Sequence, residues 1–307
     1  MASPPTVPPV AGRVVLGLLA CLLNQACGTA LPVLGGASGV GLGTRASDSH
    51  HPQEIEIRAE LTAEGHALLA AQGGWSTPKV RTDLYFDAFD GQGWAWKGGK
   101  TPWKLRIKRK AKASTMQLRR PLSREQAPAD ALPLVMNVSE SWEQTMLESQ
   151  SMALWEPGLG MLSTLQQGGF PTRKAMTELD RAWQAQLWAG ADAFAGARKA
   201  QPGLVVPTYR ADKNLLERKL SFGAGWKAEV TLGTHRTLDG AGQGTIRHEV
   251  EIAPSRNAPE AAQAMKDISD WLRTAGLTLS HLAPTPADPT LAAAKGYARV
   301  GAPRTNR

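Results

Sequence analysis

Polar and apolar residues alternate strictly in several short stretches of this chain. In residues 54–61 (EIEIRAEL), polar side chains occupy every second position and apolar side chains fill the positions between them. The same pattern recurs in residues 104–108, 227–232 and 246–252. A strand that alternates in this way has one charged face and one apolar face, so the pattern predicts β-strands.

Apolar residues recur at helical spacing in other stretches. They predict helices within residues 173–200 and at about 259–275, and a shorter one within 62–74. Residues 115–165 contain weaker strand-like runs that are interrupted by Pro and Gly. The total is about eight strands with a few helices, and most strands follow one another directly. This order favours an α+β fold with antiparallel pairing over a parallel sheet.

The charged faces leave two architectures open. If they point to solvent, the apolar faces fill an ordinary core. If they point inward, the sheet closes into a barrel around a polar tunnel, and helices cover its apolar outer face. A barrel of about eight strands is wide enough to hold one small ligand. For Glu60, Lys104 and Lys110, which lie toward strand ends, we expect exposure to solvent.

The charge of the chain favours an anionic partner. Its 307 residues are 42% hydrophobic and 20% charged, with a formal net charge of +8. A positive charge attracts nucleic acid, phosphorylated metabolites and anionic lipid alike. Nucleic acid is not expected, because no aromatic platform accompanies the basic strands and the acids between them would have no role. No obligate protein partner is evident.

The N-terminus resembles an export signal. Arg13 precedes the apolar stretch VVLGLLACLL, which is too short to span a bilayer. Both cysteines lie in this segment, and the second, Cys27, resembles the lipidated cysteine of a bacterial lipoprotein. We expect residues 1–27 to be a signal peptide, with export to the periplasm and membrane attachment only through a lipid on Cys27. An ordinary cleaved signal or an uncleaved anchor remains open. Residues 28–53 read as a flexible linker.

Five short stretches, in order, resemble motifs of the CYTH superfamily, the triphosphate tunnel metalloenzymes. Residues 54–58 (EIEIR) resemble its Glu-x-Glu-x-Lys signature, with Arg58 in place of the lysine. The later stretches are DLYFDAFD, LRIK, RTLDGAGQGTIRHEVEI and AAAKGYARV. The resemblance covers about residues 54–300. It implies the closed antiparallel barrel, with a charged tunnel and flanking helices.

The resemblance also implies a site inside that tunnel for a triphosphate and a divalent cation. The implied catalytic residues are Glu54, Glu56 and Arg58. The implied ligands of Mg²⁺ or Mn²⁺ are Glu54, Glu56, Glu249, Glu251 and Asp239. The implied phosphate-binding residues are Arg58, Arg106, Lys108, Arg210, Lys213 and Arg236. Carboxylates gathered so closely are expected to raise one another's pKa values.

Two functions are consistent with such a site. The first is metal-dependent hydrolysis of an inorganic or organic triphosphate, in which metal and bases neutralise the phosphate oxygens while water attacks in line. The second is an exported module that binds polyphosphate or another anion without hydrolysis. Arg58, Gln144 and the export signal favour the second. Arginine and lysine are not equivalent at a tight phosphate site, and Gln144 stands near where the resemblance implies another base.

Overall fold

The computed structural model describes residues 48–283, apart from the short segments 92–93, 99–101, 111–112, 187–189, 223–224 and 239–243. All described residues belong to one compact unit. The predicted signal peptide, residues 28–47 of the predicted linker, and Asp239 lie outside the described residues.

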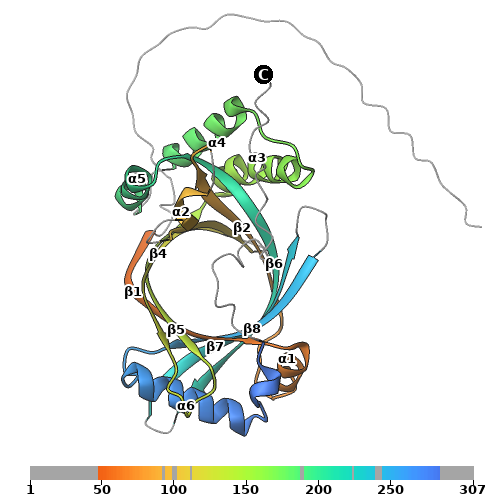
Figure 1. Ribbon diagram of the computed structural model, residues 1–307, viewed down its shortest axis with the longest axis vertical. Coiled ribbons are helices and arrows are strands. Elements are labelled where there is room, and N and C mark those ends of the chain that lie inside the picture. Colours follow the sequence, from red (N-terminus) through yellow and green to blue (C-terminus); the bar gives the residue numbers. More distant parts are fainter. Residues whose placement is uncertain are drawn as a thin grey trace, which may run out of the picture. The chain divides into compact units, whose positions relative to one another are not determined.

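Eight strands form a closed barrel, which Figure 1 shows as a ring. The strands are β1 (Asp48–Leu61), β2 (Lys79–Phe89), β3 (Lys104–Arg109), β4 (Ser114–Gln126), β5 (Val135–Met146), β6 (Leu204–Ser221), β7 (Lys227–Leu238) and β8 (Gly244–Pro254). Their order around the ring is β1-β5-β4-β3-β2-β6-β7-β8, and all neighbours are antiparallel. The predicted antiparallel α+β barrel is confirmed.

The charged faces of the strands point into this barrel. Arg119 of β4 reaches Glu56 of β1 across the intervening strand β5, so both side chains lie on the inner surface. In β3, Leu105 and Ile107 are fully buried on the opposite, outer surface. Of the two arrangements that the alternation allowed, the structure adopts the polar tunnel.

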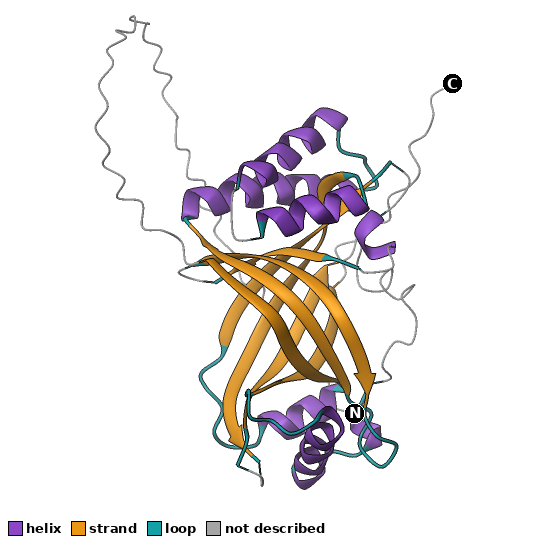
Figure 2. Ribbon diagram, turned by 90° about the vertical axis from the view of Figure 1, so that its left-hand side faces the viewer, coloured by secondary structure: helices purple, strands orange, loops and turns teal. Residues whose placement is uncertain are grey.

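Helices cover the apolar outer surface on two sides of the ring (Figures 1 and 2). The helices are α1 (Ala63–Ala70), α2 (Ala95–Gly98), α3 (Glu148–Gln166), α4 (Arg173–Ala185), α5 (Ala191–Ala200), α6 (Ala261–Thr274) and the 3₁₀ helix η1 (Leu279–His281). Helices α2 to α5 share one core with β2, β3 and β4, and α1 and α6 share another with β1, β7 and β8. No helix in the described ranges is both long enough and apolar enough to cross a membrane.

One region predicted to contain strands is a helix instead. Residues 148–166 form α3, which buries Leu154, Trp155, Met161 and Leu162 against the core. Leu154 and Met161 are seven residues apart, as are Trp155 and Leu162, and seven residues make about two turns of a helix. Pro157 lies inside the helix, where it removes one backbone hydrogen bond but does not end the helix. In the sequence, this proline interrupts the run, and for that reason a strand was predicted here.

Three element boundaries also differ from the prediction. The helix expected within 173–200 is two helices, α4 and α5, with Gly190 immediately before α5. Glycine is a poor helix former, and each helix has its own buried stripe. Strand β1 begins at Asp48, because residues 48–51 pair with β5, so the predicted linker ends earlier than residue 53. Strands β6 and β7 are each one long strand where two shorter ones were expected.

Candidate functional site

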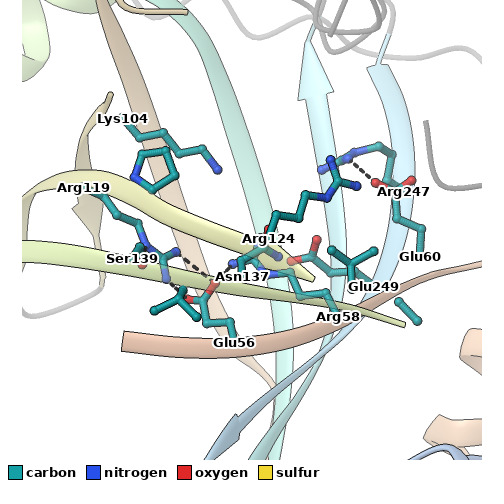
Figure 3. Close-up of a pocket in the computed structure, with 14 residues that line it drawn as sticks. Glu56, Arg58, Glu60, Lys104, Arg119, Arg124, Asn137, Ser139, Arg247 and Glu249 are labelled. Carbon is teal, nitrogen blue, oxygen red and sulfur yellow. Dashed lines mark hydrogen bonds and ion pairs between the residues drawn. The ribbon is translucent and has the colours of Figure 1, made fainter. Parts of the chain in front are cut away.

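A cavity of about 250 Å³ lies inside the barrel (Figure 3). Its wall comes from β1, β3, β4, β5 and β8. Five cationic side chains line it: Arg58, Lys104, Arg119, Arg124 and Arg247. Three carboxylates line it: Glu56, Glu60 and Glu249. This cationic excess in an enclosed space favours an anionic ligand.

Arg58 lies between the carboxylates of two neighbouring strands. It faces Glu251 across the β1–β8 pair, and its Nη2 atom is 2.7 Å from Glu251 Oε2. The same Nη2 atom contacts Glu56 Oε2. Burial acts to lower the pKa of Arg58, but Glu251 and Glu56 together hold the pKa well above its ordinary value. The guanidinium therefore stays charged and joins two acids.

Arg119 provides a second bridge, which joins Glu56 to Glu54. Its Nη1 atom donates a hydrogen bond to Glu56 Oε2 at 2.9 Å, and its Nη2 atom lies 2.8 Å from Glu56 Oε1 and 3.4 Å from Glu54 Oε2. Its Nε atom donates to Ser139 Oγ at 2.6 Å. Burial acts to raise the pKa of Glu56, but Arg58 and Arg119 hold the pKa well below its usual range. Glu56 is therefore an ionised carboxylate with two arginine partners.

Two cations of the cavity wall have no such partner. The ion pairs of the cavity use Arg58, Arg119 and Arg247, and within the described residues no ion pair involves Lys104 or Arg124. Lys104 extends into the space between the other labelled residues in Figure 3 and is accessible to solvent there. Desolvation inside the barrel, together with the charges of Arg58 and Arg119, lowers the pKa of Lys104 to about 7. An anion near Lys104 would supply the missing countercharge.

A second cationic group lines the tunnel on β2, β3 and β6. The fully buried Asp83 accepts contacts from Lys213 Nζ at 3.1 Å, Arg106 Nη1 at 3.1 Å and Arg81 Nε at 2.9 Å. The Tyr85 hydroxyl donates to Asp83 at 3.3 Å and accepts from Arg106 at 3.0 Å. Three cations surround one acid, so this group also has a net positive charge.

Lys108 lies inside the tunnel next to an acid. Its Nζ atom is 2.5 Å from Glu143 Oε1, which also accepts a hydrogen bond from Gln117. Burial and the charge of Arg106 lower the pKa of Lys108 to about 8. Lys108 therefore loses its charge at a lower pH than an exposed lysine does.

The structure places most of the predicted phosphate-binding residues inside, but not all of them. Arg210 and Arg236 lie on the outer surface of the barrel. Arg210 forms an ion pair with Asp212 of its own strand at 2.9 Å. Lys213, the residue after Asp212, points inward. Arg236 is exposed and follows the inward-pointing His235. Successive side chains of a strand point to opposite faces, so neither arginine reaches the tunnel.

Four of the predicted metal ligands lie within the described residues, and each of these four has a partner from the protein. Glu54 accepts a hydrogen bond from Ser141 Oγ at 2.9 Å. Glu249 Oε1 lies 3.2 Å from His235 Nε2, and burial lowers the pKa of that histidine to about 3. Glu56 and Glu251 share Arg58. In the part of the chain that the structure describes, no group of three or more His, Cys, Asp or Glu side chains has a geometry that could hold a metal ion.

These contacts do not fit the implied Mg²⁺ or Mn²⁺ as the side chains stand. A divalent cation of this kind needs carboxylate oxygens that are free to coordinate it, and here Arg58 or Arg119 contacts an oxygen of each of Glu54, Glu56 and Glu251. The expected rise in pKa holds for Glu251, whose pKa is raised by burial and by Glu56 and Glu249. For Glu56 the expectation is wrong, because the interposed arginines outweigh the neighbouring acids.

Sequence reasoning missed Arg119, and it favoured a solvated strand end over a site for Glu60 and Lys104. Lys104 is exposed as expected, but both residues line the cavity, and Glu60 Oε1 lies 3.0 Å from Arg247 Nη1. Lys110 is exposed as expected. A signal for Arg119 was present, because Gln117 and Arg119 alternate with apolar residues in the stretch TMQLRR. That alternation places Arg119 on the same face as the other tunnel residues.

No protein-family model matches the chain, and no curated protein matches it. Among solved structures, it is similar to HpAC1 from Hippeastrum, described as a putative adenylyl cyclase with a dominant triphosphatase activity (TM-score 0.43, 14% identity, 80% of this chain and 96% of that one). It is also similar to the PH1819 protein from Pyrococcus horikoshii OT3 (0.40, 11%, 78% and 99%). A further match is the S. pombe RNA triphosphatase Pct1 (0.32, 11%, 74% and 76%). These TM-scores are below 0.5, so we judge the site from the chain's own geometry.

Proposed function

We propose that the tunnel binds an inorganic or organic triphosphate, or a polyphosphate chain. The observation that carries this proposal is the cavity inside the closed barrel, where five cations face three carboxylates. Within the described residues, Lys104 and Arg124 have no ion-pair partner there. Phosphate oxygens are strong acceptors that suit both the fork of an arginine and the point charge of a lysine.

The second cationic group supports a linear anion with several charges. Arg106, Lys213 and Arg81 surround only Asp83, so their combined charge is not balanced by that acid. This group lies on β2, β3 and β6, whereas Lys104 and Arg119 lie on β3 and β4. A phosphate chain that extended from one group to the other would meet more of these cations than a single phosphate would.

A second candidate function is metal-dependent hydrolysis of the bound triphosphate. It is supported by the position of Glu56 and Glu251, which contact the same guanidinium and are therefore close together. If Mg²⁺ or Mn²⁺ bound here, it would neutralise charge on the phosphate oxygens. The arginine bridges would have to open first. For this reason we place binding ahead of hydrolysis.

Calorimetric titration of the purified protein with tripolyphosphate tests the proposal. Arg106→Ala should weaken binding by about 10- to 100-fold, because hydrogen bonds to charged groups are worth roughly 1.5–3 kcal/mol. Arg236→Ala is the matched control, since it removes an arginine from the outer surface and should leave affinity unchanged. Equal effects of the two substitutions would contradict a site in the tunnel. Release of inorganic phosphate in the presence of Mg²⁺ or Mn²⁺ would establish the second candidate.

A further inference from the structure

The space between Glu56 and Glu251 already contains a cation, the guanidinium of Arg58. One Nη2 atom contacts both carboxylates, at 2.7 Å on the Glu251 side. Two acids that share a single donor atom are close enough for one ion to bridge them. We propose that Arg58 is a built-in cation in this position, so that the tunnel binds its phosphate ligand without a divalent metal ion. This inference rests on the proposed function.

Arg58 is difficult for a metal ion to replace. A lysine or histidine can give up its proton and become a neutral neighbour of the metal, but an arginine in a protein stays charged. A metal ion at this position would therefore face a nearby guanidinium charge. It would also take away the two carboxylates that compensate Arg58, and a partly buried charge without a partner is costly.

The neighbouring acids also have partners from the chain. Arg119 holds the second oxygen of Glu56, and the neutral ring of His235 lies beside Glu249. The carboxylates therefore already have partners from the chain itself.

Donors for a phosphate nevertheless remain. Among the described residues, Lys104 and Arg124 line the cavity, are accessible to solvent and take part in no ion pair. The cavity wall already has more cations than acids, so a metal ion is not needed to attract an anion.

The experiment compares wild type, Arg58→Gln and the matched control Arg236→Gln. Tripolyphosphate binding is measured by calorimetry once in EDTA and once with Mn²⁺, and the melting temperature is measured with Mn²⁺ alone. For the wild type and the control, we expect tripolyphosphate to bind in EDTA and the melting temperature to stay unchanged when Mn²⁺ is added. For Arg58→Gln, Glu56 and Glu251 lose their shared partner. We expect at least tenfold weaker binding in EDTA and a new rise in melting temperature with Mn²⁺.

The outcomes separate this inference from the proposed function. A wild-type protein that binds tripolyphosphate only when Mn²⁺ is present would overturn the inference and leave the proposed function intact. A wild-type protein that binds in neither condition would overturn both. If Arg58→Gln binds as wild type does and shows no response to Mn²⁺, the role of Arg58 is wrong. Should that variant fail to fold, Arg58→Lys takes its place, with weaker binding in EDTA and a gain in Mn²⁺ response again expected.

Discussion

Lys104 is the cation of the cavity that should make ligand binding depend on pH. Desolvation inside the barrel and the charges of Arg58 and Arg119 lower its pKa to about 7. The side chain is therefore protonated at pH 6 and neutral at pH 9. Tripolyphosphate affinity should fall over this range, although the ligand itself gains negative charge as pH rises. Calorimetric titrations at several pH values measure the slope.

Substitution by arginine identifies the group responsible for this slope. Lys104→Arg keeps its charge up to high pH, so the fall in affinity should become smaller. It should not vanish, because Lys108 has a pKa of about 8 and also loses its charge. Lys110→Arg is the matched control at an exposed position and should keep the wild-type slope. A wild-type slope in Lys104→Arg would assign the pH dependence to other groups.

Arg119 should contribute to stability as well as to the site. Its side chain is 8% exposed and that of Glu56 is 7% exposed, so their contact is a buried ion pair. Removing one partner of a buried pair usually costs about 3–5 kcal/mol. Because Arg58 also compensates Glu56, we expect Arg119→Ala to lower the free energy of unfolding by about 3 kcal/mol in urea denaturation.

An exposed pair on the same protein gives the comparison. Lys174 and Glu178 form an ion pair 3.9 Å apart on the surface of α4, with side chains 86% and 61% exposed. Such pairs contribute about 0.3–0.5 kcal/mol. Lys174→Ala should therefore change stability far less than Arg119→Ala does. Similar losses for the two variants would show that burial does not set the value of the Arg119 contact.

Helix α3 packs closely on the barrel at one glycine. A Cβ atom at Gly158 would lie 3.0 Å from Leu84 Cδ2 and 3.3 Å from the ring of Phe86, both on β2. Gly160, two residues further along the same helix, has nothing within 4 Å of such an atom. The closeness of α3 to β2 therefore depends on the absence of a side chain at position 158.

Valine at each position separates packing from helix propensity. Gly158→Val should lower the free energy of unfolding by about 1–3 kcal/mol, because extra atoms in a packed core force neighbours to move. Gly160→Val changes the helix by the same residue type at an open position and should be close to neutral or slightly stabilising. Chemical denaturation measures both. If Gly158→Val and Gly160→Val had equal free energies of unfolding, α3 would be able to move away from β2 without loss of stability.

The intact chain is expected to be exported and attached to a membrane through Cys27, a proposal that concerns residues outside the described part. Cell fractionation after expression in a Gram-negative bacterium tests it. The wild type should sediment with membranes, and Cys27→Ala should not, because the acyl chains that hold a lipoprotein at the bilayer would be missing. Cys21→Ala is the matched control and should remain in the membrane fraction. An unprocessed cytoplasmic product would contradict export altogether.

The sequence by itself determined which residues share a strand face. Glu54 and Glu56 fall on one face of β1, Arg106 and Lys108 on one face of β3, because alternation is a local property of extended backbone. The antiparallel order followed from strands that are adjacent in sequence. Helix α3 was not recognised, because Pro157 interrupts a pattern that only packing against the barrel makes clear.

Only the tertiary structure decided which side of each strand faces the tunnel and which charges meet there. The alternation along a strand is the same whether its charged face points into the barrel or out to solvent. The orientation is therefore decided by the pairing of distant strands that closes the barrel. The β1–β8 pairing places Arg58 opposite Glu251, and β5 brings β4 close enough for Arg119 to reach Glu56. The sequence could not show that arginines bridge these acids, because the contacts join residues far apart in the sequence.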